Sequence, residues 1–410
     1  MRSVTEKRAL IALVATLSIQ VYVAFAANAV AVLAPVIAPQ FGLAPQLVGV
    51  FIGLLYVGSM IASLASAPLI TRHGPIRLSQ ACVLIAACGL LLLPAATLHP
   101  SAVVLLAVAP LVIGWGYGPI TPASSQLLAR TALPSRMALT FSIKQTGVPA
   151  GAALGGLLLP ALALTLGWRV TLVITALLGI VVVMGSQRVR AEFDSGRPRD
   201  ARGFELAGVF APLKLLFANP LLAELAIMGF FYAALQMSLT SFLVVFMTES
   251  LGRSLVAAGL SLTFATLGGV AGRILWGMVA DRYIPPRMLL GLLGVLAGAC
   301  SIMTAAYPAD GPATPLLILC VLFGATAIGW NGVQLAQIAR HAPEGQAAAV
   351  TAASGFVMFS GVVIGPPLFG LAATVTGGYR TGFAIIGAAA IASGAVVLIR
   401  NHRAGRRAAR

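Results

Sequence analysis

Charged residues are scarce in this sequence, and acidic residues are the scarcest of them. Only 9% of the 410 residues are charged and 59% are hydrophobic, whereas a typical soluble domain has about 25% charged residues. So few charges cannot cover a water-exposed surface, which excludes an ordinary soluble domain. The apolar runs also lack the alternation of a membrane barrel, so the expected fold class is an all-α integral membrane protein.

Residues that carry enzyme or metal chemistry are also few and scattered. The four histidines lie far apart in the sequence, and the four cysteines lie in apolar runs without metal-ligand or redox spacing. We therefore expect that the protein is not an enzyme and has no metal and no cofactor. The net charge of +16 does not indicate a nucleic-acid partner, because Lys and Arg collect in the cytoplasmic loops of membrane proteins.

Twelve apolar runs are long enough to cross a lipid bilayer as helices. They form two sets of six, which predicts two pseudo-symmetric six-helix bundles. The expected domains are an N-terminal bundle over 1–187, a cytoplasmic linker over 188–218 and a C-terminal bundle with a short basic tail over 219–410. The predicted spans lie near 10–36, 47–70, 78–97, 102–129, 138–165, 169–187, 221–247, 255–280, 288–306, 314–339, 347–374 and 381–399.

The distribution of Lys and Arg predicts the orientation of these spans. With the N-terminus inside, the outside loops contain only Arg169, Arg253 and Arg380, and the spans contain only Lys144 and Arg273. All other basic residues then lie inside, as the positive-inside rule requires. We expect a multi-pass protein of a bacterial-type inner (plasma) membrane, with both termini in the cytoplasm.

The two halves of the sequence look like repeats. Arg72 and Arg282 differ by 210 positions, as do Arg77 and Arg287, and each pair occupies the same place in its own half. This offset predicts a duplicated six-helix unit in parallel orientation, which is a common arrangement in transporters.

A short charged turn interrupts the apolar runs of the second half. Gly277, Asp281 and Arg282 match the signature G-x-x-x-D-R-x-G-R of the major facilitator superfamily, which follows the second helix there and recurs after the eighth, and Arg287 lies two positions beyond its final arginine. The chain resembles this superfamily over nearly its whole length. The fifth span also resembles the glycine-proline motif of that superfamily, with Gly147-Val148-Pro149-Ala150-Gly151 and then Gly155-Gly156.

Asp281 lies at the C-terminal end of a predicted helix, where its charge opposes the helix dipole. It therefore needs a partner, either Arg282, Arg287 or the N-terminus of a neighbouring helix such as the one beginning near Ala347. Such a contact would close one face of a transporter and break when the halves rock. The plainer interpretation is a cytoplasmic hairpin, and the first-half copy has Thr71 in place of the acid. The candidate gating residues are Asp281, Arg282, Arg287, Gly277, Arg72 and Arg77.

Lys144 and Arg273 lie inside predicted spans, where charges are costly and usually face a cavity. The resemblance implies that their helices, the fifth and the eighth, are neighbours across a central passage. An arginine eight residues before the helix-eight Asp also resembles monocarboxylate and oxalate/formate transporters, in which the arginine binds a carboxylate. A guanidinium matches a carboxylate bidentately. In the plainer interpretations, Lys144 extends to the inner surface and Arg273 pairs with Asp281 or with backbone carbonyls.

Uncharged polar and aromatic residues lie in the middle of several spans. Most of them are on helices one, four, seven and ten, which line the passage in the superfamily that the chain resembles. Hydrogen bonding between helices is the plainer explanation for the amides. The candidate substrate contacts besides Lys144 and Arg273 are Asn28, Tyr56, Trp115, Tyr117, Gln145, Tyr232, Gln236, Trp330, Asn331 and Gln334.

The function that these features indicate is secondary transport of a small organic anion by alternating access. None of the ten acidic residues lies in the middle of a span, and a basic passage without acids favours an anionic or neutral solute. Coupling to protons, as in a symporter, stays open. The alternatives are export of amphipathic drugs or metabolites and a non-transporting membrane receptor or scaffold. The expected partners are a small-molecule substrate and the lipid bilayer, and the expected state is a monomer.

Overall fold

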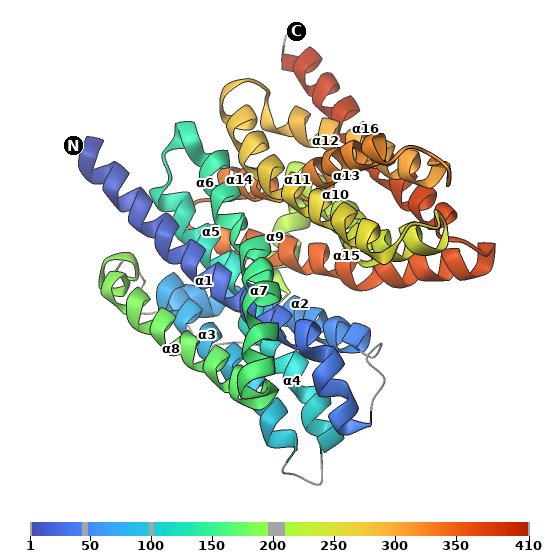
Figure 1. Ribbon diagram of the computed structural model, residues 1–410. Coiled ribbons are helices and arrows are strands. Elements are labelled where there is room, and N and C mark those ends of the chain that lie inside the picture. The colour runs from blue at the N-terminus through green and yellow to red at the C-terminus, as the bar shows by residue number, and fades with distance from the viewer. Residues whose placement is uncertain (1, 43–47, 98–101, 196–209, 409–410) are drawn as a thin grey trace. The chain divides into compact units, whose positions relative to one another are not determined.

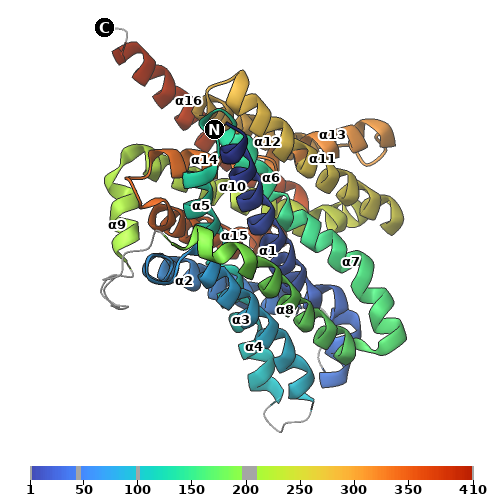
Figure 2. The same ribbon diagram turned by 90° about the vertical axis from the view of Figure 1, so that its left-hand side faces the viewer.

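The computed structural model describes residues 2–42, 48–97, 102–195 and 210–408, and the secondary structure in these ranges is helical throughout. Figures 1 and 2 show the helices from two directions. The predicted all-α class is confirmed. A helix suits such apolar segments because it satisfies every backbone N–H and C=O within the segment itself.

Within the described residues, 12 helical spans are long and apolar enough to cross a membrane, which confirms the predicted number. Some of these spans consist of two consecutive helices. The first six are formed by α1 (Arg2–Ile37), α2 (Val48–His73), α3 (Pro75–Ala96), α4 (Ala102–Tyr117) with α5 (Ile120–Thr131), α6 (Met137–Gln145) with α7 (Gly147–Leu166), and α8 (Trp168–Phe193). The second six are formed by α10 (Pro220–Glu249), α11 (Leu255–Arg282), α12 (Pro286–Ala306), α13 (Ala313–Ala327) with α14 (Asn331–His341), α15 (Ala347–Thr376) and α16 (Tyr379–Ala408).

The predicted linker at 188–218 is helical at both of its ends. α8 continues to Phe193, and the short helix α9 (Ala211–Ala218) leads into α10. Residues 196–209 of the predicted linker lie outside the described residues. The sixth span therefore extends into the predicted linker, as far as Phe193.

Helix breaks occur at equivalent places in the two halves. The break between α4 and α5 lies at 118–119, and the break between α13 and α14 lies at 328–330. These positions differ by the same 210 residues that relate the basic residues of the two halves. The duplication is therefore present in local geometry as well as in charge pattern.

The repeat is also present in the packing of helices. Gly114 of α4 lies against the carbonyl oxygen of Leu55 in α2, and Gly324 of α13 lies against the carbonyl oxygen of Ala265 in α11. Both pairs differ by 210 positions. A Cβ atom at either glycine would overlap the facing backbone, so each glycine allows two helices to approach closely, as small residues do in membrane proteins.

By its internal contacts the described chain forms two compact units. Unit 1 consists of Met1–Leu133, Lys144–Ala218 and Ala339–Phe356, and unit 2 consists of Pro134–Ile143, Asn219–Ile338 and Val357–Arg410. Each unit thus includes a short segment from the other half of the sequence. One of the boundaries falls inside α6, immediately before Lys144.

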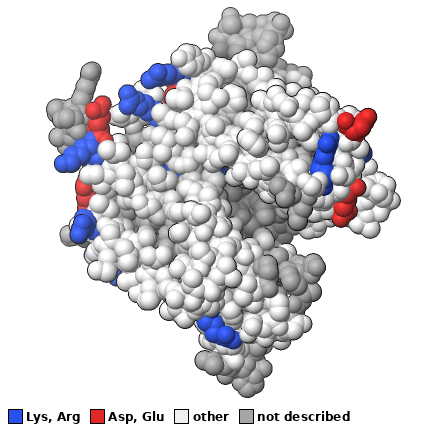
Figure 3. Space-filling view, viewed as in Figure 1, with Lys and Arg blue, Asp and Glu red and all other residues white. Residues whose placement is uncertain are grey.

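The surface agrees with a membrane environment. The face drawn in Figure 3 is mostly uncharged, with a few separate groups of charged side chains. Large apolar side chains are exposed on many helices, among them Val103, Leu164 and Val375. Lipid tails rather than water are the solvent in which such exposure costs little.

Candidate functional site

Lys144 is the centre of a buried polar cluster in unit 1. Its side chain is 1% exposed. The Nζ atom donates to Oε1 of Gln20 at 2.6 Å, to Oε1 of Gln145 at 3.0 Å and to Oγ1 of Thr121 at 3.4 Å. The interpretation in which Lys144 extends to the inner surface is therefore wrong. Hydrogen bonds to a charged group offset part of the cost of burying it.

Three helices bring this cluster together. Lys144 and Gln145 are the last two residues of α6, Thr121 lies in the first turn of α5, and Gln20 lies on α1. The glycine-proline motif of α7 lets α1 approach, because a Cβ at Gly147 would lie only 3.0 Å from Cβ of Gln20. The helix breaks at 118–119 and at Thr146 thus place polar side chains beside a lysine in the middle of unit 1.

Arg273 belongs to α11, and its side chain contacts the break between α13 and α14 in unit 2. Its side chain is 3% exposed, and its Nε atom donates to the carbonyl oxygen of Ile328 at 3.2 Å. Ile328 is the C-cap residue of α13, where carbonyls lack intrahelical partners and a cation is favoured by the helix dipole. The interpretation in which Arg273 binds a backbone carbonyl is thus confirmed for one of its five N–H groups.

Two tryptophans bond further carbonyls at the same break. Nε1 of Trp276 donates to Ala325 O at 2.8 Å, and Nε1 of the fully buried Trp330 donates to Ala327 O at 3.0 Å. The Trp330 ring also packs edge to face with Tyr232 at a centroid distance of 5.5 Å. These contacts give Trp330 a structural role beside the predicted substrate contact.

The amides near this break differ in their partners. Gln334 donates from Nε2 to the carbonyl oxygen of Leu225 at 2.7 Å, while its Oε1 is buried with no hydrogen-bond partner among the described residues. Nδ2 of Asn331 lies 3.4 Å from Sδ of Met358. A buried acceptor without a donor is costly unless a ligand or water satisfies it. Gln334 is therefore the amide in unit 2 that most clearly needs a further partner.

The remaining candidate contacts are distributed over four helices, α1, α2, α4 and α10. Tyr56 of α2 and Tyr117 of α4 pack edge to face with ring centroids 6.5 Å apart. Asn28 donates from Nδ2 to Ala24 O of its own helix at 2.8 Å, and Gln236 of α10 is half-buried. Trp115 is 49% exposed. The two tyrosines thus contact each other and Lys144 contacts Gln145. The predicted residues do not all lie together in one cluster of a unit.

Asp281 binds a helix N-terminus, which is one of the predicted kinds of partner. Its two carboxylate oxygens accept hydrogen bonds from the backbone N–H groups of Ala138 at 3.1 Å and Leu139 at 2.8 Å. The helix is α6 and not the one near Ala347. Its first-turn N–H groups have no intrahelical acceptor, and its dipole favours an anion there. Gly277 permits this approach, because its Cβ would lie 2.9 Å from Cα of Leu139.

The signature arginines have other positions. Nε and Nη2 of Arg287 donate to the carboxylate of Glu224 at 2.9 and 2.8 Å, and Arg282 is exposed. In the first half, the side chains of Arg72 and Arg77 are exposed. Arg287 is therefore a partner of Glu224 and not of Asp281.

Two further contacts at helix N-termini lie in unit 1. Asp194 accepts hydrogen bonds from the backbone N–H groups of Ile76 and Arg77, both at 3.0 Å, at the start of α3. Oε1 of Gln126 accepts the backbone N–H of Ala348 at 3.1 Å, at the start of α15. Asp194 and Gln126, like Thr121 and Glu224, were not among the predicted site residues. No local pattern marks them, because each contacts residues far away in the sequence.

No cluster of three or more His, Cys, Asp or Glu side chains with metal-binding geometry occurs in the part of the chain that the structure describes.

The model of the Major Facilitator Superfamily matches residues 16–366. The chain belongs to the major facilitator superfamily. The predicted resemblance is confirmed, and the proteins of this superfamily are transporters and not enzymes, as expected.

Curated relatives match part of the chain. An uncharacterised MFS-type transporter of Mycobacterium tuberculosis is 25% identical over 295 residues, which cover 70% of this chain and 62% of that protein. A probable anion transporter of rice, Oryza sativa subsp. japonica, is 26% identical over 226 residues, which cover 50% of this chain and 53% of that protein. The chain thus spans less than two thirds of the length of these relatives.

Solved structures share the fold over nearly the whole chain. The E. coli fucose:proton symporter has a TM-score of 0.74 at 18% identity, covering 95% of this chain and 98% of that one. A proton:xylose symporter has a TM-score of 0.72 at 16% identity, covering 96% and 95%. A bacterial homologue of the iron transporter ferroportin has a TM-score of 0.72 at 16% identity, covering 97% and 98%. Likeness at such low identity establishes the fold alone.

Proposed function

We propose that the protein is a secondary transporter that moves a small organic anion across a bacterial-type inner membrane by alternating access. In this proposal both termini are cytoplasmic, the transporter works as a monomer, and the two six-helix halves rock around the bound anion. The proposal includes coupling to protons, which would make uptake of the anion respond to a pH gradient. The observation that carries the proposal is the Lys144 cluster.

The chemistry of this cluster suits a carboxylate. The side chains of Gln20, Thr121 and Gln145 are neutral, so together with Lys144 they carry one positive charge deep in unit 1. A carboxylate oxygen in place of one amide oxygen would pair the Lys144 ammonium with an ionised acceptor, so that both partners of the hydrogen bond carry charge. The cluster would then exchange a neutral partner for an anion at low cost.

Arg273 and Gln334 are the candidates in unit 2. Arg273 supplies a guanidinium group, whose planar set of N–H donors matches a carboxylate. Oε1 of Gln334 needs a donor, which a hydroxyl group of a hydroxy acid would supply. That Lys144 and Arg273 face one passage remains a prediction from the family resemblance.

The Asp281 contact supplies the proposed gate. It holds the N-terminus of α6, and Lys144 lies in the last turn of the same nine-residue helix. Substrate binding at one end and the carboxylate contact at the other therefore act on one short helix. The positive-inside orientation places the gate at the cytoplasmic face.

The relative named as a probable anion transporter of rice agrees with an anionic substrate. The sugar:proton symporters share only the fold, so a neutral sugar is tested as an alternative substrate.

Transport by purified protein in proteoliposomes tests the proposal. Labelled mono- and dicarboxylates, neutral sugars and cationic dyes are offered with and without a pH gradient. We expect saturable uptake of carboxylates alone. Lys144→Gln should lower kcat/KM for the carboxylate by about 10-fold to 100-fold, because one charge-assisted hydrogen bond is lost. Lys214→Gln on α9 is the matched control, since it removes the same charge from an exposed position.

The other outcomes separate the alternatives. Saturable transport of dyes but not of carboxylates would establish the efflux pump. Saturable uptake of sugars alone would establish a neutral substrate. The absence of transport under every gradient would favour the receptor. Gln20→Ala keeps the charge of Lys144, so it can test the cluster if Lys144→Gln does not fold. We expect it to change KM for the carboxylate and to leave the sugars and dyes unaffected.

A further inference from the structure

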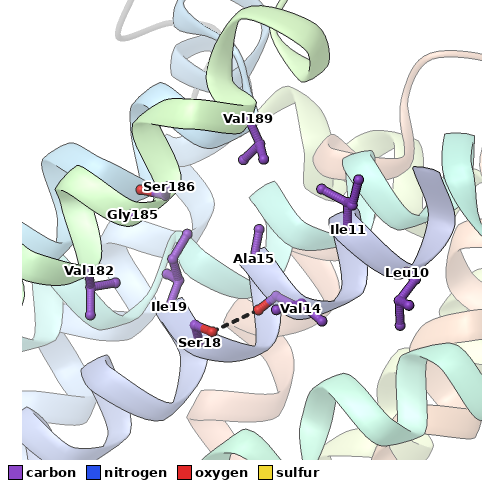
Figure 4. Close-up of a pocket in the computed structure, with 10 residues that line it drawn as sticks. All are labelled: Leu10, Ile11, Val14, Ala15, Ser18, Ile19, Val182, Gly185, Ser186 and Val189. Carbon is purple, nitrogen blue, oxygen red and sulfur yellow. Dashed lines mark hydrogen bonds between the residues drawn. The ribbon is translucent and has the colours of Figure 1, made fainter. Parts of the chain in front are cut away.

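Two open grooves occupy equivalent positions in the two units. The α1/α8 groove of about 520 Å³ lies in unit 1 and is shown in Figure 4. The α10/α16 groove of about 380 Å³ lies in unit 2. Val14 and Ser186 of the first groove correspond, at the offset of 210, to Glu224 and Val396 of the second.

The lining of the α1/α8 groove is uncharged. Its polar side chains are Ser18 and Ser186, and both hydroxyls donate to carbonyls of their own helices, at Val14 and Val183. Figure 4 shows the bond from Ser18 to Val14, with apolar side chains of α1 and α8 on either side. This groove therefore offers no charge for recognition of a ligand.

The α10/α16 groove differs because one end is charged. The Glu224 side chain is 4% exposed and binds Arg287 bidentately, and Nη1 of Arg400 lies 3.5 Å from its Oε2. One carboxylate thus holds two guanidinium groups, and the three residues carry a net charge of +1. Arg400, itself a lining residue, is 57% exposed and is accessible to a ligand in the groove.

Apart from Ser393, the rest of this groove is apolar. Ile227 and Phe231 on α10 face Ala389 and Val396 on α16. From Glu224 to Phe231 the groove extends about 10 Å along α10, at about 1.5 Å per residue. An exposed guanidinium at one end of an apolar groove on a membrane-spanning unit complements a molecule that has an anionic head and an aliphatic tail.

We propose that the α10/α16 groove binds an anionic phospholipid, with the phosphate against Arg400 and part of one acyl chain along the apolar lining. Basic pockets at the cytoplasmic ends of membrane helices attract anionic head groups. The orientation proposed above places this end in the inner leaflet. The sequence after Arg400 contains four more arginines, Arg403, Arg406, Arg407 and Arg410.

Lipid retention by the purified full-length chain tests this site. The protein is equilibrated with phosphatidylglycerol or phosphatidylcholine, and bound lipid is counted by native mass spectrometry. We expect wild type to retain phosphatidylglycerol preferentially. Arg400→Gln should reduce that retention about five-fold, the effect of one basic residue on an anionic lipid. Arg8→Gln is the matched control. Arg8 lies on α1, is exposed and pairs with Glu192, and its loss changes the net charge of the protein by the same amount.

A second variant tests the apolar part of the groove. Val396→Trp adds bulk to the α10/α16 groove without changing charge, and we expect it to reduce phosphatidylglycerol retention, whereas Val182→Trp in the α1/α8 groove should not. Equal retention of both lipids by wild type would overturn the proposal. Equal losses in Arg400→Gln and Arg8→Gln would overturn it too, since net charge alone would then explain binding. A change of oligomeric mass in Val396→Trp with lipid retention unchanged would identify the groove as an interface between copies of the chain.

Discussion

α2 and α11 occupy equivalent positions in the repeat, yet they differ in charge. α11 carries Arg273 and Asp281, whereas α2 has Ser63 and Thr71 at the positions 210 residues earlier. Arg273 binds the C-cap carbonyl of α13, and Asp281 binds the N-terminus of α6. Ser63 donates to the carbonyl of Ala352 at 3.3 Å, which is a neutral contact.

The difference extends to the helices that these residues bind. The N-termini of α6 and α15 are equivalent, since they begin at Met137 and Ala347. Asp281 caps the first with a charge, while Gln126 of α5 caps the second with a neutral amide oxygen. The duplication thus retains the steric fit of the helices, while the polar contacts of the two halves have diverged. A gate made from such contacts is asymmetric, because charge-assisted hydrogen bonds are about twice as strong as neutral ones.

The largest expected effect concerns the packing that the two repeats share. We expect Gly114→Ala and Gly324→Ala each to destabilise the protein by about 3 kcal/mol, because the new Cβ would overlap a facing backbone that cannot move without separating two helices. Thermal unfolding of the purified variants measures this. A large loss in only one variant would contradict the equivalence of the two helix pairs.

Matched controls for this prediction lie on the partner helices α2 and α11. Gly53 of α2 and Gly259 of α11 have no heavy atom within 4 Å of an added Cβ. Alanine at either position should leave stability unchanged or raise it by about 0.5–1 kcal/mol, since glycine weakens a helix interior. Destabilisation in these controls would mean that glycine acts through backbone flexibility and not through close packing.

Much of this architecture follows from sequence, because hydropathy and the 210-residue offset act locally or within a regular repeat. The rarity of charge also singles out Lys144, Arg273 and Asp281 as candidate site residues. The partners of Lys144 could not be predicted, since Gln20 and Thr121 are ordinary polar residues until folding brings them to Lys144. A pattern along one helix contains no information about which distant helix packs against it.

The next expected effect concerns the two capped helix N-termini. Asp281→Ala should increase hydrogen exchange in residues 138–143 about tenfold, because two charge-assisted hydrogen bonds are lost. Gln126→Ala should increase exchange in residues 348–353 by only about threefold, because one neutral hydrogen bond is lost. Exchange measured by mass spectrometry on the two peptides gives both values.

Arg282→Ala is the control for this pair, because Arg282 is the exposed neighbour of Asp281. It should leave exchange in both segments unchanged. Equal increases at the two N-termini, or a larger increase in Gln126→Ala, would show that charge does not make the second-half contact stronger.

The smallest expected effect is that of restoring the missing acid to the first half. In Thr71→Asp the carboxylate would lie in the last turn of α2, where it opposes the helix dipole, at a cost of about 0.3–1 kcal/mol. The new carboxylate would gain no hydrogen bond from the N–H of Ala348, because that group already donates to Gln126. Thermal unfolding should therefore show a slight destabilisation, and exchange in 348–353 should not change.

The double variant Thr71→Asp with Gln126→Ala gives the acid a free N–H group. Recovery of protection there would mean that the two helix ends still have the same geometry and differ only in the residue that caps them.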